Sequence, residues 1–350
     1  MAILPILVSC RVSAPVVVSR PMLRLRGKKR SKEALLASLR RLPEDERAAL
    51  LAEAMRPLAA KPALFALWQE HGFHVTPVHF YQPIPDTREL GPELWSRESA
   101  LAGVELRVEA QLNLLGELGR YAPELEDVPF EEPWSETEFY LKNPMFGGTD
   151  ALVLYAMLRH AKPQRIIEVG SGLSTLLARR ALAVNQRGRI TCIEPYPPAF
   201  LRGLDVELIV DKAQNVEVSV FESLAENDVL FIDSSHVVRV GGDVNFLFLE
   251  VLPRLRPGVI VHVHDVFLPL EVPRQWIVDL HLFWTEQYLL HAFLICNSGF
   301  RVLLANAYLG AHHEEAFRRA FPRSDWWGGA SFWMQRGPQA GSRPGRGAIG

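Results

Sequence analysis

The chain has 350 residues, and its 38 lysines and arginines nearly balance its 40 aspartates and glutamates. This length allows one large domain or two smaller ones, and 48% hydrophobic residues suit a folded protein with a substantial core. The near-zero net charge gives no reason to expect a nucleic acid as partner.

The two ends of the chain are expected to lie outside the folded part. In residues 1–32 the apolar run comes first and the basic residues follow, which is the reverse of a secretory signal. We interpret this segment as a disordered leader; a basic arm for a membrane surface or RNA, and a start codon placed too early, are the alternatives. Residues 337–350 are rich in glycine and predict a disordered tail.

Cysteine use and hydropathy bear on the compartment. Cys10, Cys192 and Cys296 are few and show neither a disulfide nor a zinc spacing. This fits a reducing cytoplasm, so we expect a cytoplasmic protein. No stretch reaches the roughly 18 to 20 apolar residues that a membrane span needs.

Residues 33–139 predict a helical N-terminal region with a proline-rich strap. Leucines at helical spacing in residues 33–70, interrupted by Pro43, predict a helical hairpin that serves packing or homodimer formation. The strap at 79–87, HFYQPIPDT, cannot form a regular helix or a central strand. Residues 96–121 predict another amphipathic helix.

Residues 140–336 predict a Rossmann-like α/β domain. Asp150 begins a helix, and short apolar strands then alternate with helices, which indicates a doubly wound, mostly parallel sheet. Residues 300–306 and 331–335 are expected to be the last two strands and to pair antiparallel.

The stretch RIIEVGSGLST, residues 165–175, predicts a buried strand, a tight turn and the start of a helix. Gly170 and Gly172 can take backbone angles closed to other residues and leave room for a ligand, and Ser174 can cap the helix. A strand, a Gly-x-Gly turn and a helix N-terminus together indicate a nucleotide-type site.

Two acidic residues indicate which nucleotide binds. Glu168 would repel a pyrophosphate but attract an ammonium group, and Thr175 stands where a dinucleotide fingerprint has its third glycine. S-adenosylmethionine (SAM) has an ammonium group and no phosphate. Glu194 ends the next predicted strand, near the spacing of roughly 20 residues expected for a ribose-binding acid.

The motifs IIEVGSGLST, CIEPYP, FIDSSHV and HVHDVF resemble those of bacterial class I SAM-dependent methyltransferases of family 24. The resemblance covers about residues 140–336, with fainter matches at 79–86 and 284–294. It implies that SAM is the cofactor and that the helix beginning at Asp150 helps to close its site. The expected cofactor-binding residues are Glu168, Gly170, Gly172, Ser174, Glu194, Gln214 and Asp233.

Ionisable side chains follow the fourth and fifth predicted strands. Because these strands are expected to be neighbours, Asp233, His236, His264 and Asp265 should converge. His262 faces the same way as His264, but it lies farther from the strand end and is expected to be a core histidine.

This cluster fits O-methylation of a small hydroxylated acceptor such as a sugar or a secondary metabolite; N-methylation stays open. We expect His264, Asp265 and His236 to be catalytic, with a histidine as general base. The alternative is Mg²⁺ held by Asp233 and Asp265. We favour the base because the second position reads His-Asp, not a pair of acids.

Two other function classes remain compatible with the sequence. An NAD-dependent oxidoreductase could use the same scaffold, but Glu168 and the missing third glycine count against it. A non-catalytic SAM-binding or interaction protein would keep the fold without turnover.

Overall fold

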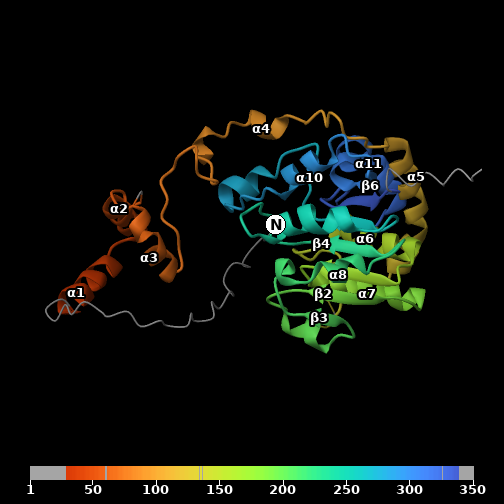
Figure 1. The fold of residues 1–350 in the computed structure, drawn as a ribbon, viewed down its shortest axis with the longest axis horizontal. Helices are drawn as coiled ribbons and strands as arrows, with labels where there is room; N and C mark the ends of the chain where they lie inside the picture. Colours follow the sequence, from red (N-terminus) through yellow and green to blue (C-terminus); the bar gives the residue numbers. More distant parts are fainter. Residues whose placement is uncertain (1–28, 60, 134, 136, 325, 339–350) are drawn as a thin grey trace, which may run out of the picture. The chain divides into compact units, whose positions relative to one another are not determined.

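The computed structural model describes residues 29–59, 61–133, 135, 137–324 and 326–338 (Figure 1). Most of the expected leader and tail lie outside these residues. The chain divides into two compact units, Met1–Leu90 and Gly91–Gly350. In the described part of the chain, no helix is both long and apolar enough to cross a membrane.

The first unit is helical. Its helices are α1 (Lys29–Arg40), α2 (Glu44–Met55) and α3 (Phe65–Glu70), with a 3₁₀ turn at Pro62–Leu64. Pro43 separates α1 from α2, as the sequence predicts, and three acidic residues in the first turn of α2 suit the positive end of the helix dipole. The predicted strap, residues 79–87, contains neither a regular α-helix nor a strand, and its last residue, Thr87, begins a 3₁₀ turn at Thr87–Glu89.

The described part of the second unit contains a seven-stranded sheet in the order β3-β2-β1-β4-β5-β7-β6. Its strands are β1 (Arg165–Val169), β2 (Arg189–Ile193), β3 (Glu207–Ile209), β4 (Val229–Ile232), β5 (Ile260–Val263), β6 (Phe300–Ala305) and β7 (Phe332–Arg336). Strands β1 to β5 pair parallel, and β7 pairs antiparallel with both β5 and β6. The predicted fold class is confirmed.

Alternating strand residues enter two hydrophobic cores, one on each face of the sheet. In β4, Val229 and Phe231 join one core, whereas Leu230 and Ile232 join the other.

The helices of this unit are α4 (Glu93–Ser96), α5 (Val108–Leu118), α6 (Gly148–Ala161), α7 (Leu173–Asn185), α8 (Val218–Glu222), α9 (Asp243–Phe246), α10 (Glu286–Leu294) and α11 (Asn306–Ala320). Helices α6 and α7 pack together in the first core, and α10 lies in the second.

The single helix predicted over residues 96–121 is wrong in its first half. Helix α5 begins only at Val108, because Leu101, Gly103 and Arg107 all have positive φ angles, which a right-handed helix does not contain. Residues 91–139 are also grouped with the sheet and not with the helices before Leu90. Gln111 of α5 shows this attachment, because its side chain accepts a hydrogen bond from the Ala305 amide at 2.8 Å.

Asp228 connects backbone segments by hydrogen bonds at the edge of the sheet opposite the predicted site. Its side chain is buried, and it accepts hydrogen bonds from the amides of Gln164, Arg165 and Ala225 at 2.8 to 2.9 Å. In Asp228→Asn, one carboxylate oxygen becomes an NH₂ group and one buried amide loses its acceptor.

We expect Asp228→Asn to lower the free energy of unfolding by about 1–3 kcal/mol. Urea denaturation followed by circular dichroism measures this change. An unchanged unfolding midpoint would show that the amide that loses its acceptor finds another partner.

Candidate functional site

The glycine turn after β1 contains two glycines with different requirements. Gly170 has φ +78°, and a Cβ on it would lie 1.7 Å from the carbonyl oxygen of Asp233, so the protein itself requires glycine there. A Cβ on Gly172 would meet no atom within 4 Å. Gly172 therefore borders open space in which a ligand can approach the backbone, as the sequence predicts.

Glu168 lies beneath this turn and is 2% exposed. Its two carboxylate oxygens accept hydrogen bonds from Ser174 Oγ and Thr175 Oγ1, each at 2.6 Å. Burial raises the pKa of Glu168 to about 7, although both hydroxyls favour its charged form. Glu168 thus joins β1 to the first turn of α7, and its contact with the cofactor stays a prediction.

Two further residues predicted to bind the cofactor are Glu194 and Gln214, which follow strands β2 and β3. The carboxylate of Glu194 accepts hydrogen bonds from the amides of Ser171 at 3.3 Å and Tyr196 at 2.8 Å, which hold it beside the glycine turn. Gln214 donates to the carbonyl of Gly241 at 3.2 Å, and its buried Oε1 has no hydrogen-bond partner among the described residues. Their contacts with the cofactor stay predictions.

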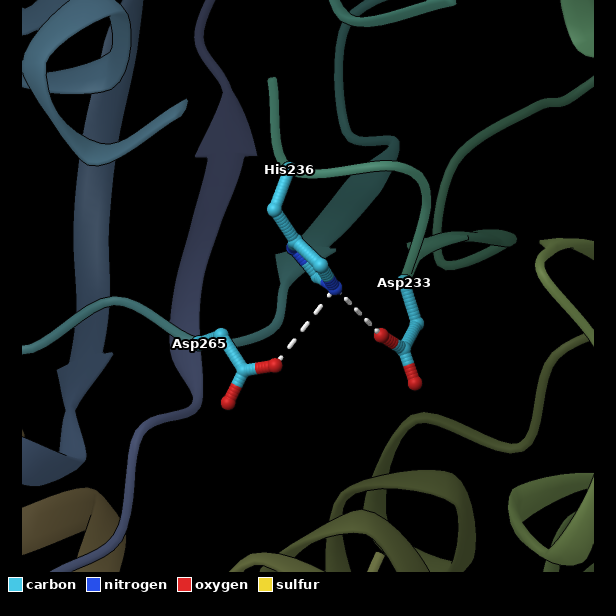
Figure 2. Close-up of side chains that lie close together, drawn as sticks. All are labelled: Asp233, His236 and Asp265. Atoms are coloured by element: carbon cyan, nitrogen blue, oxygen red, sulfur yellow. Dashed lines mark ion pairs between the residues drawn. The ribbon is translucent and has the colours of Figure 1, made fainter. Parts of the chain in front are cut away.

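Asp233, His236 and Asp265 meet at the carboxyl ends of β4 and β5 (Figure 2). His236 Nε2 lies 3.1 Å from Asp233 Oδ1 and 3.4 Å from Asp265 Oδ2. His236 and Asp265 both have left-handed backbone angles, with φ +58° and +57°, which are uncommon for residues other than glycine. Such strain is concentrated at functional sites.

His264 completes the predicted convergence. Its Nδ1 lies 3.5 Å from both Asp233 Oδ1 and Asp265 Oδ2, and its Nε2 lies 3.6 Å from Asp150 Oδ2. Burial alone would lower the pKa of His264, but the carboxylates of Asp265 and Asp233 outweigh it and raise the pKa well above its usual value. His264 therefore lies between carboxylates that favour its protonated form.

His236 is also protonated near neutral pH. Burial opposes its charge, but hydrogen bonds to Asp233 and Glu286 outweigh that effect and raise its pKa to about 10. A general base must be unprotonated. The histidine base that the sequence favours stays a prediction.

Asp150 anchors His264 from the first turn of α6. The residue is 3% exposed, and its side chain accepts hydrogen bonds from Asn306 Nδ2 and from the amides of Ala330 and Ser331, at 2.8 to 2.9 Å. Burial opposes its charge, but His264 outweighs that and keeps the pKa of Asp150 low. Asp150, a candidate pocket residue from the sequence, thus lies directly behind the site.

His262 is a core residue, as predicted. It is fully buried, its Nε2 pairs with Ser331 Oγ at 2.9 Å, and its ring stacks on Phe231 at 4.1 Å. Burial and the neighbouring His264 lower its pKa well below the usual value, so it is neutral.

The ligand atoms of Asp233, His236 and Asp265 lie within 4.8 Å of one another and could hold one metal ion. The sequence indicates the two carboxylates but not His236 as the third donor, because the turn that brings its ring back over them leaves no pattern in the sequence. Mg²⁺ prefers oxygen ligands, whereas a set of two carboxylates and an imidazole also suits Mn²⁺ or Fe²⁺. The donor set therefore fits a divalent cation.

A family model described as a methyltransferase domain, methyltransferase family 24, matches residues 167–266. A protein of Archaeoglobus fulgidus is 37% identical over 173 residues, which are 45% of this chain and 77% of that protein. The chain belongs to this methyltransferase family. The matched residues run from Ile167 in β1 to just beyond Asp265, so they include the glycine turn and the acidic cluster formed by Asp233, His236 and Asp265.

Two solved structures are similar to this methyltransferase. They are the O-methyltransferase TomG of Streptomyces achromogenes, in complex with SAM, and the methyltransferase PaMTH1 of Podospora anserina, bound to S-adenosylhomocysteine (SAH). Each is 18% identical with a TM-score of 0.36 and covers 66% of this chain; the match spans 90% of TomG and 94% of PaMTH1.

The two glycines of the turn should respond differently to alanine. We expect Gly170→Ala to lower the free energy of unfolding by more than about 2 kcal/mol, because the positive φ is strained and the Cβ meets backbone. Gly172→Ala should change it by less than about 1 kcal/mol, because its Cβ meets open space. Thermal unfolding of both variants measures this, and equal destabilisation would contradict the geometry.

Proposed function

We propose that this methyltransferase transfers a methyl group from SAM to a hydroxyl of a small acceptor, such as a sugar or a secondary metabolite. Asp233, Asp265 and His236 would hold a divalent cation at the acceptor. The observation that carries the proposal is their position: three metal-ligating atoms lie within 4.8 Å of one another, and the backbone of Asp233 lies against Gly170 of the cofactor turn.

The cofactor end of the site is built on the glycine turn. The open space at Gly172 allows close approach to the backbone, and Glu194 is held where it can accept hydrogen bonds from ribose hydroxyls. Glu168 keeps the first turn of α7 in place and adds negative character near the ammonium group. SAM supplies a methyl group activated by its sulfonium.

The acceptor end is built on the carboxylates after β4 and β5. A divalent cation there lowers the pKa of a bound hydroxyl and fixes its orientation. Asp233 and Asp265 offer oxygen ligands, and His264 Nδ1 lies 3.5 Å from an oxygen of each, where its protonated form would balance part of their charge. Asp150 in turn restrains His264.

Binding of SAH tests the cofactor half of this proposal. We expect micromolar affinity by titration calorimetry and loss of detectable binding in Glu194→Ala, because the ribose loses its carboxylate. Glu207→Ala on the neighbouring strand β3 is the matched control and should bind as the wild type does. Undiminished binding by Glu194→Ala would contradict the assigned ribose site.

Proton release tests the metal half. His236 must lose its proton before Nε2 can bind a cation, so Mn²⁺ affinity should rise by up to about tenfold per pH unit between pH 6 and pH 8. Calorimetry in buffers with different ionisation enthalpies should detect close to one released proton per Mn²⁺. A pH-independent affinity without proton release would exclude His236 as a ligand.

Catalysis itself is tested by turnover with hydroxylated acceptors. Asp265→Asn should reduce the rate strongly while leaving SAH affinity intact, because the change lies at the acceptor end. Equal rates in Asp265→Asn and the wild type would favour a non-catalytic role for this cluster.

A further inference from the structure

Glu286, the first residue of α10, contacts His236 from the side opposite the acidic cluster. Its Oε2 lies 2.9 Å from His236 Nδ1, while His236 Nε2 faces Asp233 and Asp265. The side chain of Glu286 is 3% exposed. The two nitrogens of one ring thus have different partners, a buried carboxylate on one side and the proposed cation site on the other.

This arrangement selects one form of the imidazole. A neutral imidazole carries a proton on one nitrogen and a lone pair on the other. A carboxylate beside Nδ1 keeps the proton there, which leaves the lone pair on Nε2 directed at the carboxylates of Asp233 and Asp265. That lone pair is the one that a cation in this site requires.

The segment that carries Glu286 also holds the backbone of His236. The carbonyl of His236 accepts hydrogen bonds from the amides of Thr285 at 2.8 Å and Glu286 at 3.0 Å. The Trp284 ring lies 4.4 Å from the imidazole ring, and Thr285 Oγ1 accepts from the Val238 amide at 2.8 Å. These contacts keep His236 in its left-handed conformation.

Stability alone is a poor account of Glu286. Burying a carboxylate costs several kcal/mol, and an oxygen left without a hydrogen bond adds to that cost. Here Oε1 has no hydrogen-bond partner among the described residues, in contrast to Asp228, whose two oxygens serve three amides. The burial of Glu286 is therefore better explained by its contact with His236.

We propose that Glu286 is a positioning residue that orients His236 as a metal ligand through the Nδ1 contact. The inference rests on the proposed function, because orienting the His236 ring matters for metal binding only if Asp233, His236 and Asp265 hold a cation. The fainter motif WTEQYLLHAFL, which contains Glu286, is thereby connected to the chemistry of β4 and β5.

The test compares Mn²⁺ affinity, measured by calorimetry with the metal alone, in the full-length protein and three variants. We expect Glu286→Ala to weaken binding by roughly 10- to 100-fold. Glu286→Gln keeps an oxygen that can accept a hydrogen bond from His236 Nδ1, so its Mn²⁺ affinity should lie between those of Glu286→Ala and the wild type. Asp228→Asn, another buried carboxylate changed to an amide, should bind Mn²⁺ as the wild type does.

Nitrogen-15 NMR of the histidine rings supplies a readout that a structural role would not change. In Zn²⁺-loaded wild type, His236 should carry its proton on Nδ1, and in Glu286→Ala this form should be mixed with others. Wild-type affinity in Glu286→Ala, or an unchanged ring form, would overturn the inference while the metal site stands. Absence of wild-type binding would overturn the metal site and this inference together, leaving SAH binding as a separate result.

Discussion

The concentration of carboxylates around two imidazoles is the interaction on which the site depends. Asp150, Asp233, Asp265 and Glu286 surround His236 and His264, and these side chains are largely buried. So much buried negative charge is unfavourable unless cations neutralise it. Without a metal, these carboxylates raise the pKa of both rings and so favour their protonated forms. A cation bound in the proposed site would replace the proton on His236.

The topology of the sheet explains why these groups meet. Strands β1, β4 and β5 are adjacent and parallel, so the glycine turn, Asp233 and Asp265 emerge at one edge. The antiparallel strand β7 then brings Ala330 and Ser331 to Asp150, which attaches α6 behind His264. Helix α10 attaches the other ring, His236, through Glu286. Donor and acceptor sites therefore share one edge of a rigid scaffold.

The sequence predicts much of this because strand ends are easy to recognise. A buried apolar run followed by a polar residue locates Glu168, Asp233 and Asp265, and the parallel order places them together. The individual contacts between these side chains are harder to predict from the sequence. Neither the left-handed turns at His236 and Asp265 nor the pairing of each ring with particular carboxylates has a sequence signal. The choice between a histidine base and a metal ion therefore stays open at the level of the sequence. Likewise, helical spacing alone did not reveal the positive φ angles before α5.

The central claim is that one edge of the sheet holds a methyl donor beside a cation. A crystal structure of the protein grown with SAH and Mn²⁺, with anomalous data at the manganese edge, tests it most directly. The account predicts an anomalous peak bound by Asp233, Asp265 and His236 Nε2, with SAH lying along Gly172 and its ribose on Glu194. SAH in that position with no peak among these three side chains would contradict the metal-assisted mechanism, and SAH bound elsewhere would contradict the site as a whole.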